Sequence, residues 1–191
     1  MKKIILLSLA SIVLNACSVG VTKEDDGNSL SLNRTSMVQR HYDDELIPKG
    51  TLFSWSPNIK GVYQDNRLNH VNMDNLLKKS IESTLVKKGY LFTENVASAG
   101  YTVTYTAALK SALSDDEVLK IFGAQPGLLP SRKLDEKVEK GTLIVDVINQ
   151  KTGHLHWRSI GQALARLDEI PQQYRAQRVE QFVNFLLSGL H

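Results

Sequence analysis

The sequence predicts an α+β fold: a two-layer sandwich with a mixed, mostly antiparallel sheet and two main helices on one face. Three observations lead to this fold class. Residues 101–109 alternate between apolar side chains and threonine, which is typical of a strand, whereas residues 73–88 and 171–187 repeat apolar side chains at helical spacing. Two amphipathic helices need an apolar sheet face to cover, and the alternating strand supplies part of one.

The segments before residue 89 predict two strands and a helix. Residues 37–42 could form a short strand with Val38 and Tyr42 on one side, and residues 51–55 form a second, apolar strand that Ser-Pro ends. The helix over 73–88 should begin at Asn72 as its N-cap and end at Gly89 in a left-handed C-cap. Because this helix connects two strands, we expect the strands to be parallel, joined by a right-handed crossover.

The middle of the chain predicts a strand, a short helix and an irregular segment. Strict alternation over 101–109 indicates a half-buried strand whose threonines face solvent, namely Thr102, Thr104 and Thr106. Residues 114–117 read Ser-Asp-Asp-Glu, a capping box that opens a helix ending near Phe122. Residues 123–132 contain two prolines and two glycines and are expected to be irregular.

The last third predicts a hairpin followed by a helix. Strands over 141–148 and 155–165 should be joined by a turn in which Gly153 supplies a positive φ. Pro171 suits the first position of the final helix. The mixed charges of residues 133–140 are most simply a solvated surface.

Composition and charge argue against a nucleic-acid partner. The 191 residues suit one domain, and 42% of them are hydrophobic, which is ordinary for a globular protein. The net charge of +3 comes from 23 basic and 20 acidic residues. Two of the lysines belong to a leader that we expect to be cleaved, so no basic face is indicated. No nucleic acid and no cofactor are expected.

The N-terminus predicts an export signal followed by a lipid anchor. Residues 4–14 form an apolar run of about 16 Å as a helix, roughly half the thickness of a bilayer core. This length is typical of a signal peptide. The run ends in Leu14-Asn15-Ala16-Cys17, which resembles the lipobox of bacterial lipoproteins, in which the peptide is cut before the cysteine and the thiol is acylated. An ordinary secretory signal beside an accidental cysteine is the alternative.

The predicted organisation therefore has three parts. Residues 1–16 are the signal peptide, residues 17–35 are the acylated Cys17 with a polar tether, and residues 36–191 are a single α+β domain. The membrane is expected as a partner through the lipid of Cys17, since two or more acyl chains give stable attachment. By resemblance to enterobacterial lipoproteins, Ser18 indicates the periplasmic face of the outer membrane.

Several segments of the predicted domain together resemble a known family. They are Thr51-Leu-Phe-Ser-Trp55, Lys88-Gly-Tyr90, Tyr101-Thr-Val-Thr-Tyr105, Gly141-Thr-Leu-Ile-Val-Asp146 and Thr152-Gly-His-Leu-His-Trp157. The sequence resembles the periplasmic lipoproteins of domain of unknown function 4136 over about residues 36–188. The resemblance implies a lipobox followed by one α+β domain, and it implies no catalytic residues.

The candidate polar sites each have a structural alternative. His154 and His156 are spaced to share one strand face and could bind zinc if Asp146, His41 or His70 supplied a third ligand. Exposed hairpin histidines are the simpler interpretation. Asp146 could be a carboxylate with a perturbed pKa, but a solvent position or a pair with Arg158 across the hairpin is favoured.

The aromatic residues and the motif search add no catalytic group. Trp55 and Trp157 could stack on a sugar or peptide, although their apolar neighbours favour core packing. Serine nucleophile, phosphate-loop and dinucleotide motifs are absent from the sequence.

Three functions follow from these observations. The leading hypothesis is a non-catalytic envelope lipoprotein that binds an envelope protein or glycan or supports its assembly. The second is a periplasmic metal-dependent hydrolase built on His154, His156 and Asp146. The third is a small-ligand or glycan binder that uses the Tyr101/Tyr105 face or the loop over 123–132.

Overall fold

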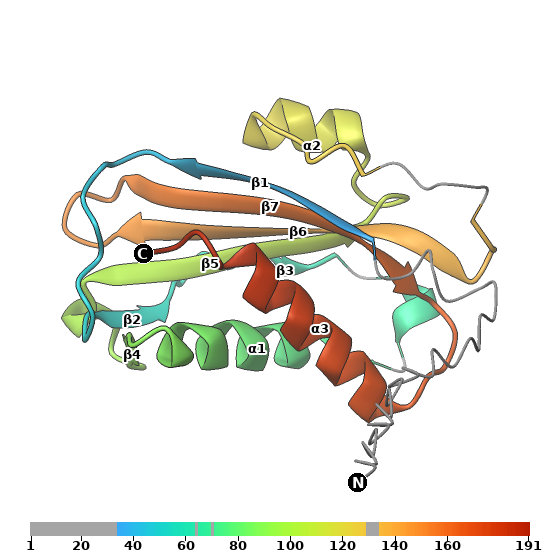
Figure 1. Cartoon of the computed structure of the whole chain (residues 1–191), viewed down its shortest axis with the longest axis horizontal. Helices are drawn as coiled ribbons and strands as arrows, with labels where there is room; N and C mark the ends of the chain where they lie inside the picture. Colours follow the sequence, from blue (N-terminus) through green and yellow to red (C-terminus); the bar gives the residue numbers. More distant parts are fainter. Residues whose placement is uncertain (1–33, 64, 70, 129–133) are drawn as a thin grey trace, which may run out of the picture.

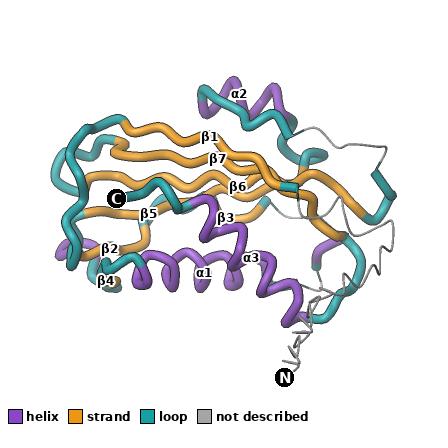
Figure 2. The backbone as a smooth tube through the Cα atoms, viewed as in Figure 1, coloured by secondary structure: helices purple, strands orange, loops and turns teal. Residues whose placement is uncertain are grey.

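The computed structural model describes residues 34–63, 65–69, 71–128 and 134–191. It confirms the predicted fold class: one mixed sheet with the two long helices packed on the same face (Figures 1 and 2). The helices are α1 (Met73–Lys87) and α3 (Gln172–Leu186), and α3 runs obliquely past α1 in both views. A short helix, α2 (Asp115–Phe122), lies over the opposite face.

Three long antiparallel strands and an edge strand form most of the sheet. They are β1 (Thr35–His41), β5 (Tyr101–Leu109), β6 (Val138–Asn149) and β7 (Leu155–Arg166), ordered β1-β7-β6-β5. β6 and β7 form the predicted hairpin, with Gly153 at a φ of 71° in its turn. The alternating and apolar runs of the sequence therefore identify these strands correctly.

The far edge of the sheet is parallel, as the crossover argument predicts. β2 (Leu52–Trp55) pairs in parallel with β5 and with β4 (Leu91–Phe92), and β3 (Gly61–Val62) also pairs with β5. β3 and β4 are not predicted from the sequence, because strands of two residues carry no detectable alternation.

Local capping follows the sequence closely, with one difference. The side chain of Asn72 accepts from the backbone of Asn75, and Gly89 adopts a φ of 92° after α1. Pro171 lies one residue before α3 rather than inside it. Its extended ψ of 131° makes it the N-cap, and its carbonyl accepts from the backbone of Arg175.

The helix-covered face holds the main apolar core. Trp157, Ile81 and Leu85 are completely buried there, with residues from both long helices and from the inward positions of the strands. At Gly161 of β7, an added Cβ would overlap the side chains of Leu186 and Phe182. α3 therefore lies closer to the sheet than any larger residue would allow.

The other face is less exposed than the sequence predicts. Thr102 and Thr106 were expected to face solvent, but they are only 3% and 4% exposed. Val118 and Phe122 of α2 pack against Ile144 and its neighbours on this side of the sheet. The prediction of a half-buried strand is wrong because a capping-box helix and the segment after it fold back over the threonine side.

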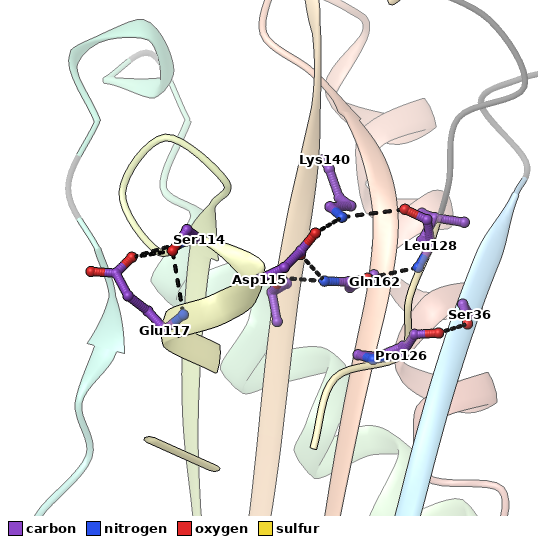
Figure 3. A network of polar contacts seen from close by, with 9 residues as sticks. Ser36, Ser114, Asp115, Glu117, Pro126, Leu128, Lys140 and Gln162 are labelled. Atoms are coloured by element: carbon purple, nitrogen blue, oxygen red, sulfur yellow. Dashed lines mark hydrogen bonds and ion pairs between the residues drawn. The ribbon is translucent and has the colours of Figure 1, made fainter. Parts of the chain in front are cut away.

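A polar network holds this covering layer in place (Figure 3). The ammonium of Lys140 lies 2.5 Å from Asp115 and donates to the carbonyl of Leu128. Gln162 donates to Asp115 and accepts from the backbone N–H of Leu128. Ser36 adds a bond to the carbonyl of Pro126. Lys140 is 4% exposed, so its assignment to a solvated surface is wrong: it lies in β6 under the first turn of α2.

Candidate functional site

An apolar cavity of about 150 Å³ is lined by the sheet, by the start of α1 and by α3 as far as Phe182. It exists because the strands carry small residues at this end of the helix-covered face. Ala107, Gly141, Ala163 and Ala165 line it, and the register places Gly141 opposite Ala163. At the other end of the same face, Trp157 and the tyrosines of β5 fill the corresponding space. The helices therefore rest on bulky residues at one end and leave a void at the other.

The helices and the neighbouring loops supply larger apolar walls. Met73 and Leu77 of α1 and Val179 and Phe182 of α3 line the cavity. Tyr63, Leu68 and Ile170 come from connecting segments, and Tyr63 is 39% exposed. Because the walls come from separate elements and part of the rim is exposed, the cavity is continuous with the surface on one side.

The charged residues that line the cavity are three arginines, Arg166, Arg175 and Arg178. Arg175 is only 7% exposed and donates to the carbonyls of Arg166 and Asp168 at 3.1 and 2.9 Å. Arg178 donates to the carbonyl of Leu164 at 3.0 Å. Arg166 forms an ion pair with the carboxylate of Asp168. These contacts fix the three guanidinium groups around one end of α3.

Arg175 is a charged side chain held in a largely buried position, and this lowers its pKa. Burial lowers the pKa of Arg175, and the charges of Arg178 and Arg166 act in the same direction, whereas Asp168 opposes them. A guanidinium nevertheless keeps its charge in a protein. The cavity wall therefore combines hydrocarbon with positive charge that is shielded from water.

The cavity offers little that could catalyse a reaction. Among its described lining residues, the only side-chain hydroxyls are those of Thr142 and Tyr63, and there is no histidine, cysteine, serine or carboxylate. Arginine does not act as a general base at neutral pH because its pKa is too high. The chemistry that these side chains support is binding.

The two candidate histidines lie in different surroundings. His154 is exposed in the turn before β7, whereas His156 is 2% exposed and contacts the ring of Tyr101 at 5.0 Å between centroids. The expectation that both are exposed on one strand face is wrong for His156. β7 begins only at Leu155, and an irregularity in its pairing with β6, between Val147 and Ile148, changes the register here.

The other proposed ligands do not join the histidines. Asp146 forms a bidentate ion pair with Arg158, at 2.6 and 2.7 Å, as the favoured interpretation predicts. His41 contacts His191 at 5.6 Å between ring centroids, and His70 lies outside the described residues. Within residues 34–63, 65–69, 71–128 and 134–191, no three side chains of His, Cys, Asp or Glu are grouped so that they could hold a metal ion.

The aromatic candidates belong to the core. Trp157 is fully buried and Trp55 is half-buried, as predicted. Tyr101 and Tyr105 are 7% and 1% exposed, so they form no open platform for a glycan. Tyr105 hydrogen-bonds Asp74 at the start of α1, and burial together with this bond raises the pKa of its hydroxyl.

The cavity and its arginines are not predicted from the sequence. A signal was present: Gly161-Gln-Ala-Leu-Ala165 places three small residues at alternate positions of one strand. Only the strand register shows that two of them, Ala163 and Ala165, lie beside Gly141 of β6 and line a common void with it and with Ala107 of β5. The cavity was therefore predictable only in part.

The features predicted for the N-terminus lie outside the part of the chain that the structure describes. Cys17, the predicted acylation site, lies among residues 1–33, whose structure is not described. In the described ranges, no helix combines the length and hydropathy of a membrane span.

Comparison with known proteins places the chain in a family. The sequence profile of the family described as "Domain of unknown function (DUF4136)" matches residues 38–189. The chain has no significant match among curated proteins.

Several solved structures resemble the chain. A PelC dodecamer from Paraburkholderia phytofirmans is 12% identical, with 82% of this chain and 97% of that chain covered at a TM-score of 0.48. A DUF4136 family protein from Bacteroides thetaiotaomicron is 10% identical, with 81% and 94% covered at 0.48. Lipoprotein GNA1162 from Neisseria meningitidis is 8% identical, with 73% and 99% covered at 0.38. The match to the family profile extends over most of this chain and confirms the predicted resemblance: the protein belongs to the DUF4136 family.

Proposed function

We propose that this protein is a lipid-anchored module of the bacterial cell envelope that acts by binding rather than by catalysis. Residues 1–16 direct export and are removed, Cys17 is acylated, and the tether to residue 35 connects the lipid to the folded domain. The domain then stands at the periplasmic face of the outer membrane. Its partner is an envelope protein or a glycan.

The binding role is supported by one observation: the ionisable side chains that could act in catalysis are held in structural contacts. Asp146 is held by Arg158, Asp115 is held by Lys140, and His156 lies under Tyr101. These groups stabilise strands and the α2 layer instead of lining a cleft. The described cavity is walled mostly by hydrocarbon and arginine, and its lining includes no histidine, lysine or carboxylate that could activate the hydroxyls of Thr142 and Tyr63.

The anchor is tested by labelling cells that express the chain with an alkyne analogue of palmitate. The wild-type protein should become labelled and sediment with membranes, whereas a Cys17→Ser variant should do neither. Ser18→Asp serves as the sorting test, because an acidic residue there should move the labelled protein from the outer to the inner membrane. Equal labelling of wild type and Cys17→Ser would refute the lipid anchor.

The binding role is tested in intact cells with a photo-crosslinking amino acid. At Tyr63, on the exposed rim of the cavity, it should give one adduct of defined mass; at the exposed Val86 of α1 it should give none. Identical adduct patterns at both positions would mean that the rim has no specific partner.

A further inference from the structure

We propose that residues 42–50, the segment that joins β1 to β2, form a pH-sensitive clasp: protonation of His156 on β7 draws Asp43 into an ion pair and fixes the segment across the end of the sheet. Three strands, β7, β6 and β5, lie between β1 and β2 in the sheet. The segment therefore has to cross the end of all three, at the left of Figure 1. This proposal requires neither the lipid anchor nor the cavity.

His156 is the buried half of the clasp. Its side chain is almost fully buried, and its ring lies against the ring of Tyr101 with 5.0 Å between the centroids. Within the part of the chain that the structure describes, the Nδ1 atom of His156 has no hydrogen-bond partner. A buried polar atom without a partner costs free energy. A change that gives Nδ1 a partner is therefore favoured.

Asp43 is already placed beside this nitrogen. The backbone N–H of Tyr42 donates to the carbonyl of His156 at 2.9 Å, which holds the following residue near the ring. The Oδ1 atom of Asp43 accepts from the backbone N–H of Glu45 at 3.0 Å, whereas its Oδ2 atom lies 3.8 Å from Nδ1 of His156. That distance is too long for a hydrogen bond. The two groups are therefore close but not joined.

The charge of His156 decides whether this gap closes. In a neutral imidazole only one ring nitrogen carries a proton, whereas both nitrogens are donors in the charged ring. The charged ring offers Asp43 a charge-assisted hydrogen bond, which is stronger than a neutral one. Histidine is the side chain that ordinarily changes charge between about pH 5 and 8, where carboxylates are ordinarily charged. The clasp therefore closes at mildly acidic pH and opens as the ring loses its proton.

The other ionisable groups around this pair do not oppose the closure. Burial raises the pKa of Tyr101, and the carboxylates of Glu45 and Asp43 raise it further, so the hydroxyl of this tyrosine stays neutral. Glu45 adds a second negative charge on the segment that faces the imidazole. Arg158, two residues further along β7, is paired with Asp146. Three more histidines lie at this end of the sheet and titrate in the same range: His41, His154 and His191.

The clasp acts on the middle of the segment, because both ends are fixed at any pH. Tyr42 is held by its backbone bond to β7, and Ile47 is 3% exposed and packs in the main core. Between them, Leu46 is 63% exposed. Joining Asp43 to β7 would restrict residues 43–46, so pH would set how firmly this exposed apolar side chain is positioned.

The test measures amide hydrogen exchange in the full chain by mass spectrometry, at about pH 5.5 and about pH 8, on either side of the ordinary histidine transition. Protection factors, which correct for the intrinsic effect of pH on exchange, should be about fivefold higher for residues 43–46 at the acidic pH, as expected for one partly exposed ion pair. Asp43→Asn keeps the oxygen that accepts from Glu45 but loses the charge, so its protection should not change with pH. Asp44→Asn, at the exposed neighbour, is the matched control and should behave as the wild type.

A double-mutant cycle separates this pair from the other histidines. The coupling between Asp43→Asn and His156→Gln, measured by urea unfolding, should be about fivefold in the unfolding equilibrium constant at the acidic pH and absent at the alkaline pH. His154→Gln, at the exposed histidine of the same turn, should show no coupling to Asp43→Asn at either pH. Because His156→Gln replaces a buried residue, nitrogen-15 NMR of the wild type gives an independent measurement: both ring nitrogens of His156 should carry protons at the acidic pH only.

Three outcomes would overturn the proposal. A His156 ring that stays neutral at the acidic pH would mean that burial prevents the charge on which the clasp depends. Equal protection of residues 43–46 at both pH values would mean that the charged ring does not hold the segment. A pH-dependent protection that survives in Asp43→Asn would assign the effect to another group. None of these outcomes bears on whether Cys17 is acylated, so the two proposals fail separately.

Discussion

The two faces of the sheet are held by different kinds of interaction. On the α1/α3 face, apolar side chains from both long helices pack on the inward residues of the strands. On the α2 face, a smaller apolar cluster is joined to a network in which Lys140, Asp115 and Gln162 fix the helix and the segment after it. Apolar packing tolerates small shifts, whereas charge-assisted hydrogen bonds require defined positions.

This difference explains how the helix face can carry the cavity described above. On the first face, large side chains of the sheet at one end are enough to position the helices. Small residues of the strands at the other end therefore leave a cavity without preventing the helices from packing. On the second face, polar atoms that lost their partners would cost free energy, and the network leaves each of its named groups bonded. Loose packing is therefore compatible with the helix face but not with the α2 face.

The largest expected effect comes from removing apolar packing beneath α1. Leu85 is fully buried, and Leu85→Ala should lower the free energy of unfolding by about 2–5 kcal/mol through lost transfer energy and a new cavity. Urea denaturation followed by tryptophan fluorescence measures this change. Val86→Ala is the control: Val86 is the next residue of the helix but is 50% exposed, so its replacement should change stability by less than about 0.5 kcal/mol.

A smaller effect is expected on the other face from removing one charge. Lys140→Met keeps the aliphatic stem but deletes the ammonium that binds Asp115 and the carbonyl of Leu128. Because the Asp115 side chain is 27% exposed and water can reach it in part, we expect a loss of about 1–2 kcal/mol. Lys137→Met, at an exposed lysine of the same segment, should be neutral. Equal stability of both variants would show that the network does not hold α2.

The same network predicts a dependence on pH. Burial alone would raise the pKa of Asp115, but hydrogen bonds from Lys140 and Gln162 and the charge of Lys140 outweigh it, so the pKa lies below its ordinary value of 3.8. The unfolded state therefore takes up a proton first as pH falls. The stabilisation from Asp115 is complete above about pH 5 and is lost as pH falls from about 4 through the lower pKa of the folded state.

The Asp115→Asn variant isolates this contribution. Between pH 6 and pH 2.5, the free energy of unfolding should fall by about 1 kcal/mol less in this variant than in the wild type. Urea titrations at each pH measure this fall. Other carboxyls with lowered pKa, such as Asp74 and Asp168, keep some acid sensitivity in both proteins. Asp116→Asn, at an exposed neighbour, should follow the wild-type profile. An unchanged slope in Asp115→Asn would contradict the assignment.

The contrast between the faces also explains what could be predicted from the sequence. Apolar periodicity identifies α1, α3 and the long strands because burial on one side leaves a repeat along the chain. The capping box of α2 is local and was recognised as well. The burial of Lys140 could not be predicted, because its partner Asp115 belongs to a different element of the fold. The cavity needed the register of three strands, and the burial of His156 needed an irregular pairing in the β6/β7 hairpin.

The smallest effect should come from an exposed ion pair between the two long helices. The ammonium of Lys87 lies 2.5 Å from Glu180, but the side chains are 59% and 46% exposed. Water and salt screen such a pair, and ordering two long side chains opposes it, so Lys87→Gln should change the free energy of unfolding by less than about 0.5 kcal/mol. Urea titrations should show this small difference at low salt and a still smaller one at high salt.

This prediction is the sharpest check on the comparison between the faces, because α1 and α3 also share apolar core residues and a hydrogen bond between Thr84 and Asn184. If packing alone positions the helices, they should tolerate the loss of an exposed charge. A loss in Lys87→Gln as large as that in Lys140→Met would mean that specific polar contacts hold this face too. The cavity would then need another explanation, since it is explained here by helices that are positioned only by packing on the large side chains at the other end of the sheet.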